Sequence, residues 1–402
     1  MARSSRLQLA GLAAAYLLPA PLAIVSPRSA AACLVVALLV LIASDLQQAK
    51  ARILAGWRNM LISRLLFWTL IAVLLLAPAS SYWSIAPHLS LVVAAKLVSM
   101  TLVGMLWYFS FDARHSRTIF WLLFLGGSFA AVLLLLELNE ITAIVGLFND
   151  DHAFSRYNRP CLIAFLSSCL AVILASREGD PGLRLLAWGL YLLMGLAVLT
   201  SLSETVKLLL LAFPLLWAGF SVLPPYLARL TGFAPLAIYA VFPLAVPHMT
   251  WLMAIASKAA PESLLAQSAA GARIQLWNQF LDAAYQRPWL GWGFGAERDI
   301  PLPEVPGALY HDVWSHPHSL PIQTLVNLGW SGFVLVALLL FAFGLANARQ
   351  NGKYLASSGA LSTCIMITWC ISHGAWQSWW IAIIAILLTP LMSRPVPAAD
   401  TT

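Results

Sequence analysis

Twelve stretches of mostly apolar residues recur along the 402-residue chain, and short polar segments separate most of them. A helix needs about 20 such residues to cross the hydrocarbon core of a bilayer. The pattern therefore predicts an all-α polytopic membrane protein with about 12 transmembrane helices. The predicted spans are residues 7–25, 30–46, 63–80, 88–110, 117–138, 160–176, 184–201, 205–223, 232–256, 318–346, 356–373 and 378–392.

One polar segment is much longer than the others and separates the ninth and tenth predicted spans. This division predicts nine transmembrane helices within 1–256, a loop subdomain at 257–317, and three further transmembrane helices within 318–402. A polar stretch of this length in an otherwise apolar chain is the natural place for chemistry. We therefore expect the functional site to involve this loop.

Apolar residues at helical spacing predict a helix over residues 269–286 inside the loop. We expect this helix to lie along the membrane surface with its apolar face down. The glycine- and tryptophan-rich residues 288–295 predict a tight turn, with Trp289 and Trp292 anchored at the membrane interface.

Basic residues are spread unevenly over the two sides of the predicted topology. With a cytoplasmic N-terminus, the cytoplasmic segments hold fourteen Lys and Arg residues and the short outer segments hold four. Short cytoplasmic loops of membrane proteins carry this excess of positive charge. The pattern predicts that both termini are cytoplasmic and that the long loop faces outward. In a bacterium, that loop lies in the periplasm beside the inner membrane.

The composition narrows the class of protein further. The chain is 61% hydrophobic and only 10% charged, which fits a lipid solvent and not water. Its net charge of +7 does not indicate nucleic-acid binding, because the basic residues are scattered singly over many loops. The five cysteines lie in apolar runs without a CxxC pair, so we expect neither a disulfide framework nor a zinc–thiolate site.

Two side chains at opposite ends of the loop are the main candidates for catalysis. Arg273 shares a helix face with Trp277, and its guanidinium is suited to gripping the phosphates of a diphosphate lipid. An arginine that meets ordinary lipid headgroups is the alternative. His318 begins the tenth span, where a neutral imidazole can accept a proton from a hydroxyl group. A histidine that only caps the helix is the alternative.

Further cations and imidazoles fall on the same side of the predicted membrane. Arg156, Arg159 and Lys207 would line an outward cavity that suits an anionic lipid-linked substrate, unless each separately reaches toward the headgroups. His311, Asp312, His316 and His318 raise the question of a metal site. Their spacing matches no closed zinc site, so we expect no metal.

Three motifs together resemble the O-antigen ligase/O-antigen polymerase family. They are R-x-x-x-W from Arg273 to Trp277, PWLGWGFG at 288–295, and HSLPIQTLVNLGWSG at 318–332. The resemblance covers roughly residues 200–335 in motif and the whole chain in topology. The chain departs from the family pattern at Ser319, where Asn is common, and at Asn327, where Glu is common. Glu204 stands where a basic residue is frequent.

The resemblance implies a glycosyltransferase that needs no metal or other cofactor. The implied donor is a polysaccharide on undecaprenyl diphosphate, and the acceptor is lipid A–core for a ligase or another lipid-linked repeat for a polymerase. His318 and Arg273 would be catalytic, and Arg156, Arg159 and Lys207 would bind diphosphate. Sugar binding or loop shaping would fall to His316, Trp277 and Gln323.

Two alternatives remain open from the sequence alone. An inverting single displacement is expected unless a carboxylate acts as nucleophile, for which Glu297, Asp299, Glu304 and Asp312 are candidates. A transporter of a lipid-linked or anionic solute is the alternative of another class. We find no pair of matching halves, which many transporters carry.

Overall fold

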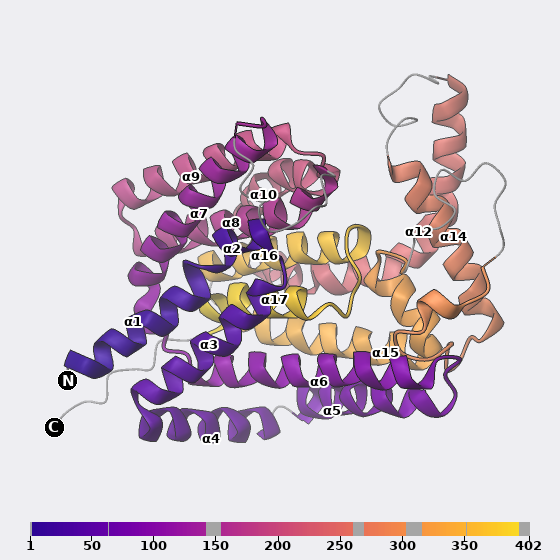
Figure 1. Cartoon of the computed structure of the whole chain (residues 1–402), viewed down its shortest axis with the longest axis horizontal. Coiled ribbons are helices and arrows are strands. Elements are labelled where there is room, and N and C mark those ends of the chain that lie inside the picture. Colours follow the sequence, from indigo (N-terminus) through magenta and orange to yellow (C-terminus); the bar gives the residue numbers. More distant parts are fainter. Residues whose placement is uncertain are drawn as a thin grey trace.

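Eleven of the twelve predicted apolar runs each coincide with a helix in the computed structural model, whereas the first run, residues 7–25, is divided between two helices (Figure 1). The structure describes residues 2–62, 64–141, 154–259, 269–302, 316–350 and 352–393. The described residues contain no strand. The helices are α1 (Ala2–Tyr16), α2 (Pro19–Val25), α3 (Ser29–Ser44), α4 (Leu46–Ile62), α5 (Arg64–Ala79), α6 (Pro87–Ser110), α7 (Ser116–Leu138), α8 (Asn158–Glu178), α9 (Pro181–Thr200), α10 (Glu204–Val222), α11 (Pro225–Ala228), α12 (Ala234–Ala259), α14 (Ala269–Gln286), α15 (Leu320–Ala348), α16 (Gly352–Ile371) and α17 (Ser378–Met392). Short 3₁₀ turns are η1 (Ser80–Tyr82), η2 (Ala113–His115), η4 (Phe154–Tyr157), η5 (Arg229–Phe233) and η6 (Glu297–Asp299).

The protein is a multi-pass membrane protein by the length and apolarity of its helices. Within the described ranges, nine helices are long and apolar enough to cross a bilayer on their own. Two bent helix pairs pass the same test together, one bent by 48° between α1 and α2 and the other by 115° between α3 and α4. The apolar helix α17 has 15 residues and is shorter. An α-helix satisfies the hydrogen bonds of its backbone groups internally, as a lipid environment requires.

Helix α4 is the main element that the apolar pattern did not predict. Residues 47–62 lie between two predicted spans and are predicted to form a cytoplasmic loop, with Lys50, Arg52 and Arg58 among its positive charges. The segment is rich in residues of high helix propensity, and it forms a helix that turns sharply away from α3. Arg52 Nη2 donates to Asp112 Oδ2 at 2.7 Å and thereby ties α4 to the end of α6.

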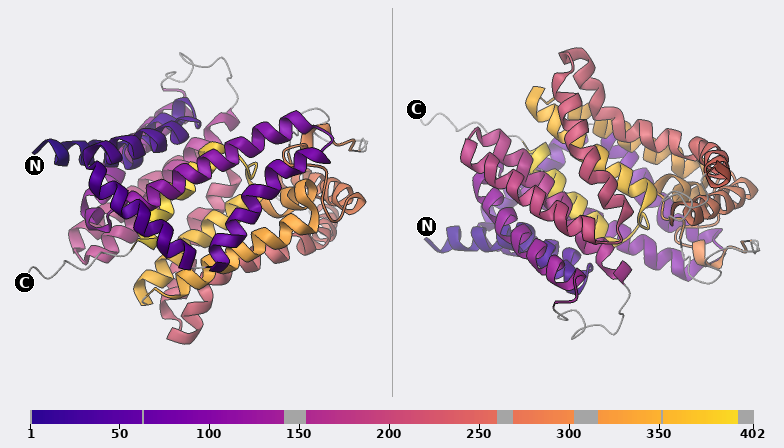
Figure 2. Two further views of the ribbon diagram at one scale, coloured as in Figure 1. Left: turned by 90° about the horizontal axis from the view of Figure 1, so that it is seen from below. Right: turned by 90° about the horizontal axis from the view of Figure 1, so that it is seen from above.

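Two polar contacts mark one end of the bundle. At this end, Arg52 bonds to Asp112, and Arg177 Nη1 donates to the carbonyl of Pro390 at 3.3 Å. Arg52, Asp112 and Arg177 belong to segments or helix ends that are predicted to be cytoplasmic. Pro390 lies inside α17. Helix α14 lies at the other end, opposite the start of α1 (Figures 1 and 2). This grouping agrees with the alternating topology, whereas the compartment that each end faces stays a prediction.

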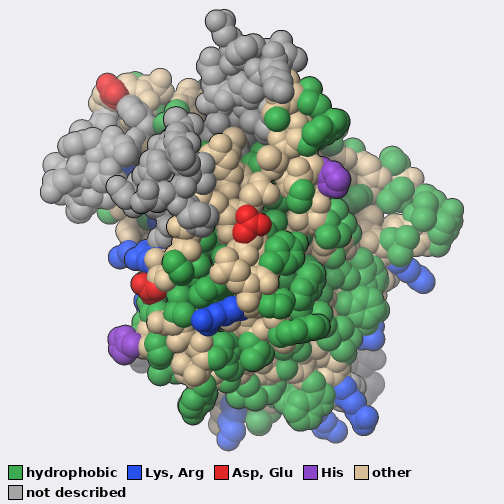
Figure 3. All heavy atoms as spheres, turned by 90° about the vertical axis from the view of Figure 1, so that its right-hand side faces the viewer, with side chains coloured by type: hydrophobic (Ala, Val, Ile, Leu, Met, Phe, Trp, Pro, Cys, Tyr) green, Lys and Arg blue, Asp and Glu red, His purple; other side chains and the backbone are tan. Residues whose placement is uncertain are grey.

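Helix α14 confirms the predicted helix at 269–286 but not its predicted environment. Its apolar side chains are buried against α12 and α15, and Trp277 packs edge-on against Phe242 at 5.0 Å between ring centroids. The apolar face therefore contacts protein and not the membrane surface as expected. The opposite face, with Gln275 and Asp282, is exposed. Figure 3 shows this end of the molecule, where hydrophobic side chains form much of the described surface.

The turn at 288–295 packs into a break in α15. The backbone leaves helical geometry at Gly329, where φ is +61°. Trp292 N–H donates to Val326 O at 2.8 Å, and Trp330 N–H donates to Pro288 O at 2.7 Å. The loop thus supplies the backbone partners that the broken helix lacks.

Gly291 allows this close approach of turn and helix. Its φ is +66°, and a Cβ there would lie 2.5 Å from backbone atoms of Val326 and Asn327. Trp289 is 72% exposed, as an interfacial residue should be. Trp292 is instead buried, with its indole N–H donating to Ala283 O at 2.8 Å, so the prediction of an interfacial Trp292 is wrong.

Candidate active site

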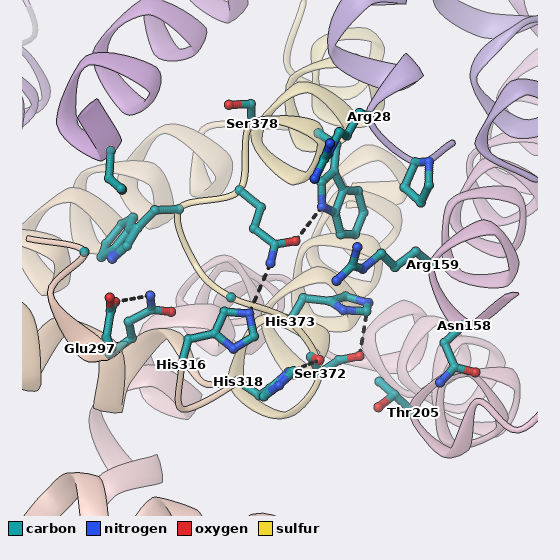
Figure 4. Close-up of a pocket in the computed structure, with 18 of the residues that line it drawn as sticks. Arg28, Asn158, Arg159, Thr205, Glu297, His316, His318, Ser372, His373 and Ser378 are labelled. Carbon is teal, nitrogen blue, oxygen red and sulfur yellow. Dashed lines mark hydrogen bonds between the residues drawn. The ribbon is translucent and has the colours of Figure 1, made fainter. Parts of the chain in front are cut away.

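A large pocket opens at the α14 end of the bundle, with a volume of about 1280 Å³. Its walls come from segments far apart in the sequence: the connection between α2 and α3, the starts of α8, α10 and α14, the loop around η6, the approach to α15, and the connection between α16 and α17 (Figure 4). The charged and imidazole side chains that line it are Arg28, Lys96, Arg156, Arg159, Glu204, Arg273, Glu297, Arg298, His316, His318 and His373.

Arg273 and His318 both attach to the C-terminal end of α16. Arg273 Nη1 donates to Ile371 O at 3.1 Å, and His318 Nδ1 lies 2.9 Å from Ser372 O. The last carbonyls of a helix have no partner within the helix and carry partial negative charge, so they attract such donors. The two residues predicted to be catalytic are thus anchored on adjacent carbonyl groups in one pocket.

The geometry of His318 defines the state of its ring. A carbonyl oxygen can only accept, so Nδ1 carries the hydrogen and the lone pair of the neutral ring lies on Nε2. Burial, reinforced by the nearby His316 and Arg273, lowers the pKa of His318 to about 3. The imidazole is therefore neutral near pH 7, as a general base must be.

The backbone at His318 adopts an uncommon conformation. Its φ is +52°, a region that side chains other than glycine rarely occupy. The preceding Pro317 is buried, and its carbonyl accepts from the indole N–H of Trp277 at 2.8 Å. Trp277 does not line the pocket. It holds the segment that presents His318, which corresponds to the loop-shaping option predicted for it.

The arginines predicted to bind diphosphate lie in the pocket, but the lysine does not line it. Arg156 Nη2 donates to Tyr157 Oη at 2.8 Å, and that hydroxyl donates to Glu137 at 2.7 Å. The Arg159 guanidinium lies 5.9 Å from the centre of a Trp379 ring. Lys207 is one turn further along α10 than Glu204, and only the first residues of that helix reach the pocket.

A carboxylate network holds one wall of the pocket. The amide nitrogens of Gln323 and Asn327 both donate to Oε1 of the buried Glu297, the latter at 2.8 Å. The Gln323 oxygen accepts the N–H of Ala375 at 2.7 Å. Gln323 therefore joins α15 to two loops, and burial raises the pKa of Glu297. Asn327, which stands where the family commonly has Glu, here meets a carboxylate supplied by the loop.

Several pocket residues were not predicted from the sequence. Arg28 is an isolated arginine between α2 and α3, and Ser372, His373 and Gln377 lie in the connection that the hydropathy pattern located least well. No local motif marks them, because only tertiary packing brings them to the pocket. No group of three metal-binding side chains occurs within the described ranges, and His311 and Asp312 lie outside those ranges.

Part of this site lies in a region that is similar to a known protein family. A family model described as O-antigen ligase matches residues 189–337, which include Arg273, Glu297, His316 and His318. The chain carries an O-antigen ligase family domain. Other pocket residues, among them Arg28, Arg159 and Ser372, lie outside the matched region of that domain.

Curated relatives carry related names. Proteins of Rickettsia conorii and Rickettsia felis, provisionally named polysaccharide ligases, are 22% identical over 290 residues and 24% identical over 297 residues. These matches cover 66% and 69% of this chain and 65% and 68% of the relatives, so the chain spans about two thirds of their length. The general O-oligosaccharyltransferase of Acinetobacter baylyi is 26% identical over 104 residues, 25% of this chain and 17% of that protein. These matches relate the chain to polysaccharide ligases and to an O-oligosaccharyltransferase.

Proposed function

We propose that this protein is an O-antigen ligase that transfers a polysaccharide from undecaprenyl diphosphate to a lipid A–core acceptor at the outer face of the bacterial inner membrane. The observation that carries the proposal is the anchoring of Arg273 and His318 on adjacent carbonyls inside one cationic pocket. The O-antigen ligase domain and the names of the relatives support the same reaction class.

The proposed reaction is a single displacement at the anomeric carbon. The acceptor hydroxyl oxygen forms a bond to that carbon while the bond from the carbon to the diphosphate oxygen breaks. The hydroxyl proton moves to Nε2 of His318, whose Nδ1–H stays bonded to Ser372 O. The diphosphate leaves with the bonding electron pair and remains attached to the polyprenol.

Arginine side chains take up the charge that develops on the leaving diphosphate. Arg273 would contact its oxygens, with Arg156 and Arg159 extending the cationic wall. A diphosphate is already a good leaving group, so this neutralisation replaces a divalent metal. Lys207 lies behind this wall and would contribute at most through its longer-range charge.

The acids of the pocket favour inversion over a double displacement. Glu204 and Glu297 are the carboxylic acids among the described lining residues. Oε1 of Glu297 is held by two amide donors and is therefore poorly disposed to attack a sugar. We therefore propose a single displacement with inversion, in which neither acid acts as the nucleophile. The transferred sugar should then have the opposite anomeric configuration to the same sugar in the donor.

Reconstitution tests this proposal. Purified protein is mixed with polysaccharide-linked undecaprenyl diphosphate and lipid A–core, with Arg273→Ala, His318→Ala and Arg58→Ala in parallel. The exposed Arg58 lies on α4, far from the pocket, and serves as the matched arginine control. We expect the parent and Arg58→Ala to transfer polysaccharide to core, with or without EDTA, and both pocket variants to lose at least about 100-fold in rate.

The other outcomes of this assay discriminate between reactions. Elongation of the lipid-linked chain without transfer to core would assign the polymerase reaction instead. Full activity in both pocket variants would remove the site assignment. Movement of intact lipid-linked sugar across the bilayer without any glycosyl transfer would indicate that the protein is a transporter and not a glycosyltransferase.

A further inference from the structure

We propose that His316 and His318 form a two-point clamp for the acceptor sugar, in which His316 Nδ1–H donates to one hydroxyl oxygen while His318 Nε2 accepts the proton of its neighbour. The inference rests on the proposed glycosyl transfer and adds the way in which the acceptor is recognised. Their rings lie next to each other in the pocket, with centroids 4.1 Å apart and planes nearly perpendicular (Figure 4).

A chain of hydrogen bonds fixes the tautomer of His316. The indole N–H of Trp379 can only donate, and it bonds to Gln377 Oε1 at 2.5 Å. The other amide atom of Gln377 must therefore be nitrogen, which donates to His316 Nε2 at 3.1 Å. Because Nε2 of the neutral ring accepts this bond, the hydrogen of His316 is on Nδ1.

The resulting N–H group is buried. His316 Nδ1 has no hydrogen-bond partner among the residues that the structure describes, although the ring lines the pocket. Leaving a buried donor without an acceptor is unfavourable. A substrate oxygen that enters the pocket would supply the missing acceptor.

The two histidines have opposite tautomers, which defines the ligand that fits. His318 offers a lone pair at Nε2, because its Nδ1–H is committed to Ser372 O, and His316 offers an N–H at Nδ1. Phosphate oxygens only accept hydrogen bonds from protein, so they satisfy His316 but not His318. A sugar with two neighbouring hydroxyl groups presents an acceptor and a donor together. The pair therefore selects the acceptor sugar and not the diphosphate.

A cycle of enzyme and acceptor variants tests this clamp. The enzymes are the parent, His316→Phe and Gln377→Met, with Gln350→Met as a matched control at the opposite end of the bundle, where Gln350 bonds to Asn347. The acceptors are lipid A–core and an analogue that lacks the hydroxyl group next to the attacking hydroxyl group. KM is measured separately for donor and acceptor, and each melting temperature is compared with that of the parent.

The expected result is a coupled loss on the acceptor side alone. His316→Phe should raise the KM for the acceptor about tenfold and leave the donor KM unchanged, as the loss of one buried hydrogen bond predicts. Gln377→Met should raise the KM for the acceptor about two- to fivefold, because His316 then populates both tautomers. With the deoxy acceptor, the acceptor KM of the parent should rise about tenfold, and that of His316→Phe should not rise further.

Two results would overturn the clamp. One is an equal loss on the deoxy acceptor in the parent and in His316→Phe, which would mean that the two groups do not meet. The other is a change confined to the donor KM. Neither result affects the proposed reaction, which fails separately if the parent transfers no sugar to core or if His318→Ala is as active as the parent.

Discussion

Gly291 lies where the long loop packs closely against the broken helix α15. Replacing it with alanine adds one methyl group. That methyl carbon would lie 2.5 Å from Val326 O and from the Asn327 carbonyl carbon, at a residue whose φ is +66°. The same segment of α15 holds the Glu297 carboxylate through Gln323 and Asn327. Gly291→Ala therefore perturbs both the fold and the pocket wall.

The size of the effect follows from two contributions. An alanine in the left-handed region costs about 1–2 kcal/mol, and forcing a methyl group against close-packed backbone costs about 1–3 kcal/mol more. Gly179→Ala separates them, because Gly179 has a φ of +76° but nothing within 4 Å of an added Cβ. We expect a loss of about 2–5 kcal/mol for Gly291→Ala and about 1–2 kcal/mol for Gly179→Ala.

Thermal unfolding in detergent measures this difference. All five cysteines are buried, so a thiol-reactive fluorogenic dye reports unfolding. With roughly 1–2 °C per kcal/mol for a chain of this length, Gly291→Ala should melt several degrees below Gly179→Ala. It should also lose more than tenfold in transfer rate, whereas Gly179→Ala should stay within about twofold of the parent. Equal melting temperatures and equal rates for the two variants would refute the argument.

Two further predictions concern His318. Its pKa of about 3 lies below the usual 6.5, so the base stays unprotonated as the pH falls, and kcat/KM should be flat from pH 8 to about pH 5. An inflection near pH 6.5 in the pH–rate profile would contradict this environment. The unfolded state binds the proton below pH 6.5 and the folded state does not, so the stability contributed by the neutral ring is present above pH 6.5 and is lost as the pH falls. The second prediction concerns the backbone, where φ is +52°. Both His318→Gly and His318→Ala should be inactive, but the glycine variant should be more stable by about 1 kcal/mol, because only glycine adopts this conformation without strain. A glycine variant that melts below the alanine variant in the same dye assay would show that the backbone is unstrained.

The helices could be predicted well because lipid imposes a simple rule on sequence. Every apolar run is helical, although the first is divided between α1 and α2, and the helical spacing inside the loop located α14 as well. Helix α4 was missed, since it is too polar to register as a span. The surroundings of α14 were predicted wrongly for a related reason: an apolar helix face looks the same in sequence whether protein or lipid covers it.

The candidate site was only partly predictable. Arg273 and His318 stand beside recognisable motifs, and the structure brings them to one helix end. Arg28 and Gln377 have no such motif, because their place in the pocket depends on how distant helices pack. Lys207 was grouped with the other cations by its side of the membrane. Sidedness does not specify depth along a helix, and one turn is enough to remove a side chain from the pocket lining.

Both reactive side chains take their positions from the terminus of α16 and not from each other. A change in the length of the chain between residues 302 and 316 would therefore leave the guanidinium and the imidazole correctly placed relative to each other, provided that α16 and the residues around His318 are left intact. A single residue inserted into α16 just before Ile371 would instead rotate the terminal carbonyls by roughly 100° and misdirect both groups at once. We therefore expect changes in the length of the segment between residues 302 and 316 to be tolerated better than insertions near the end of α16.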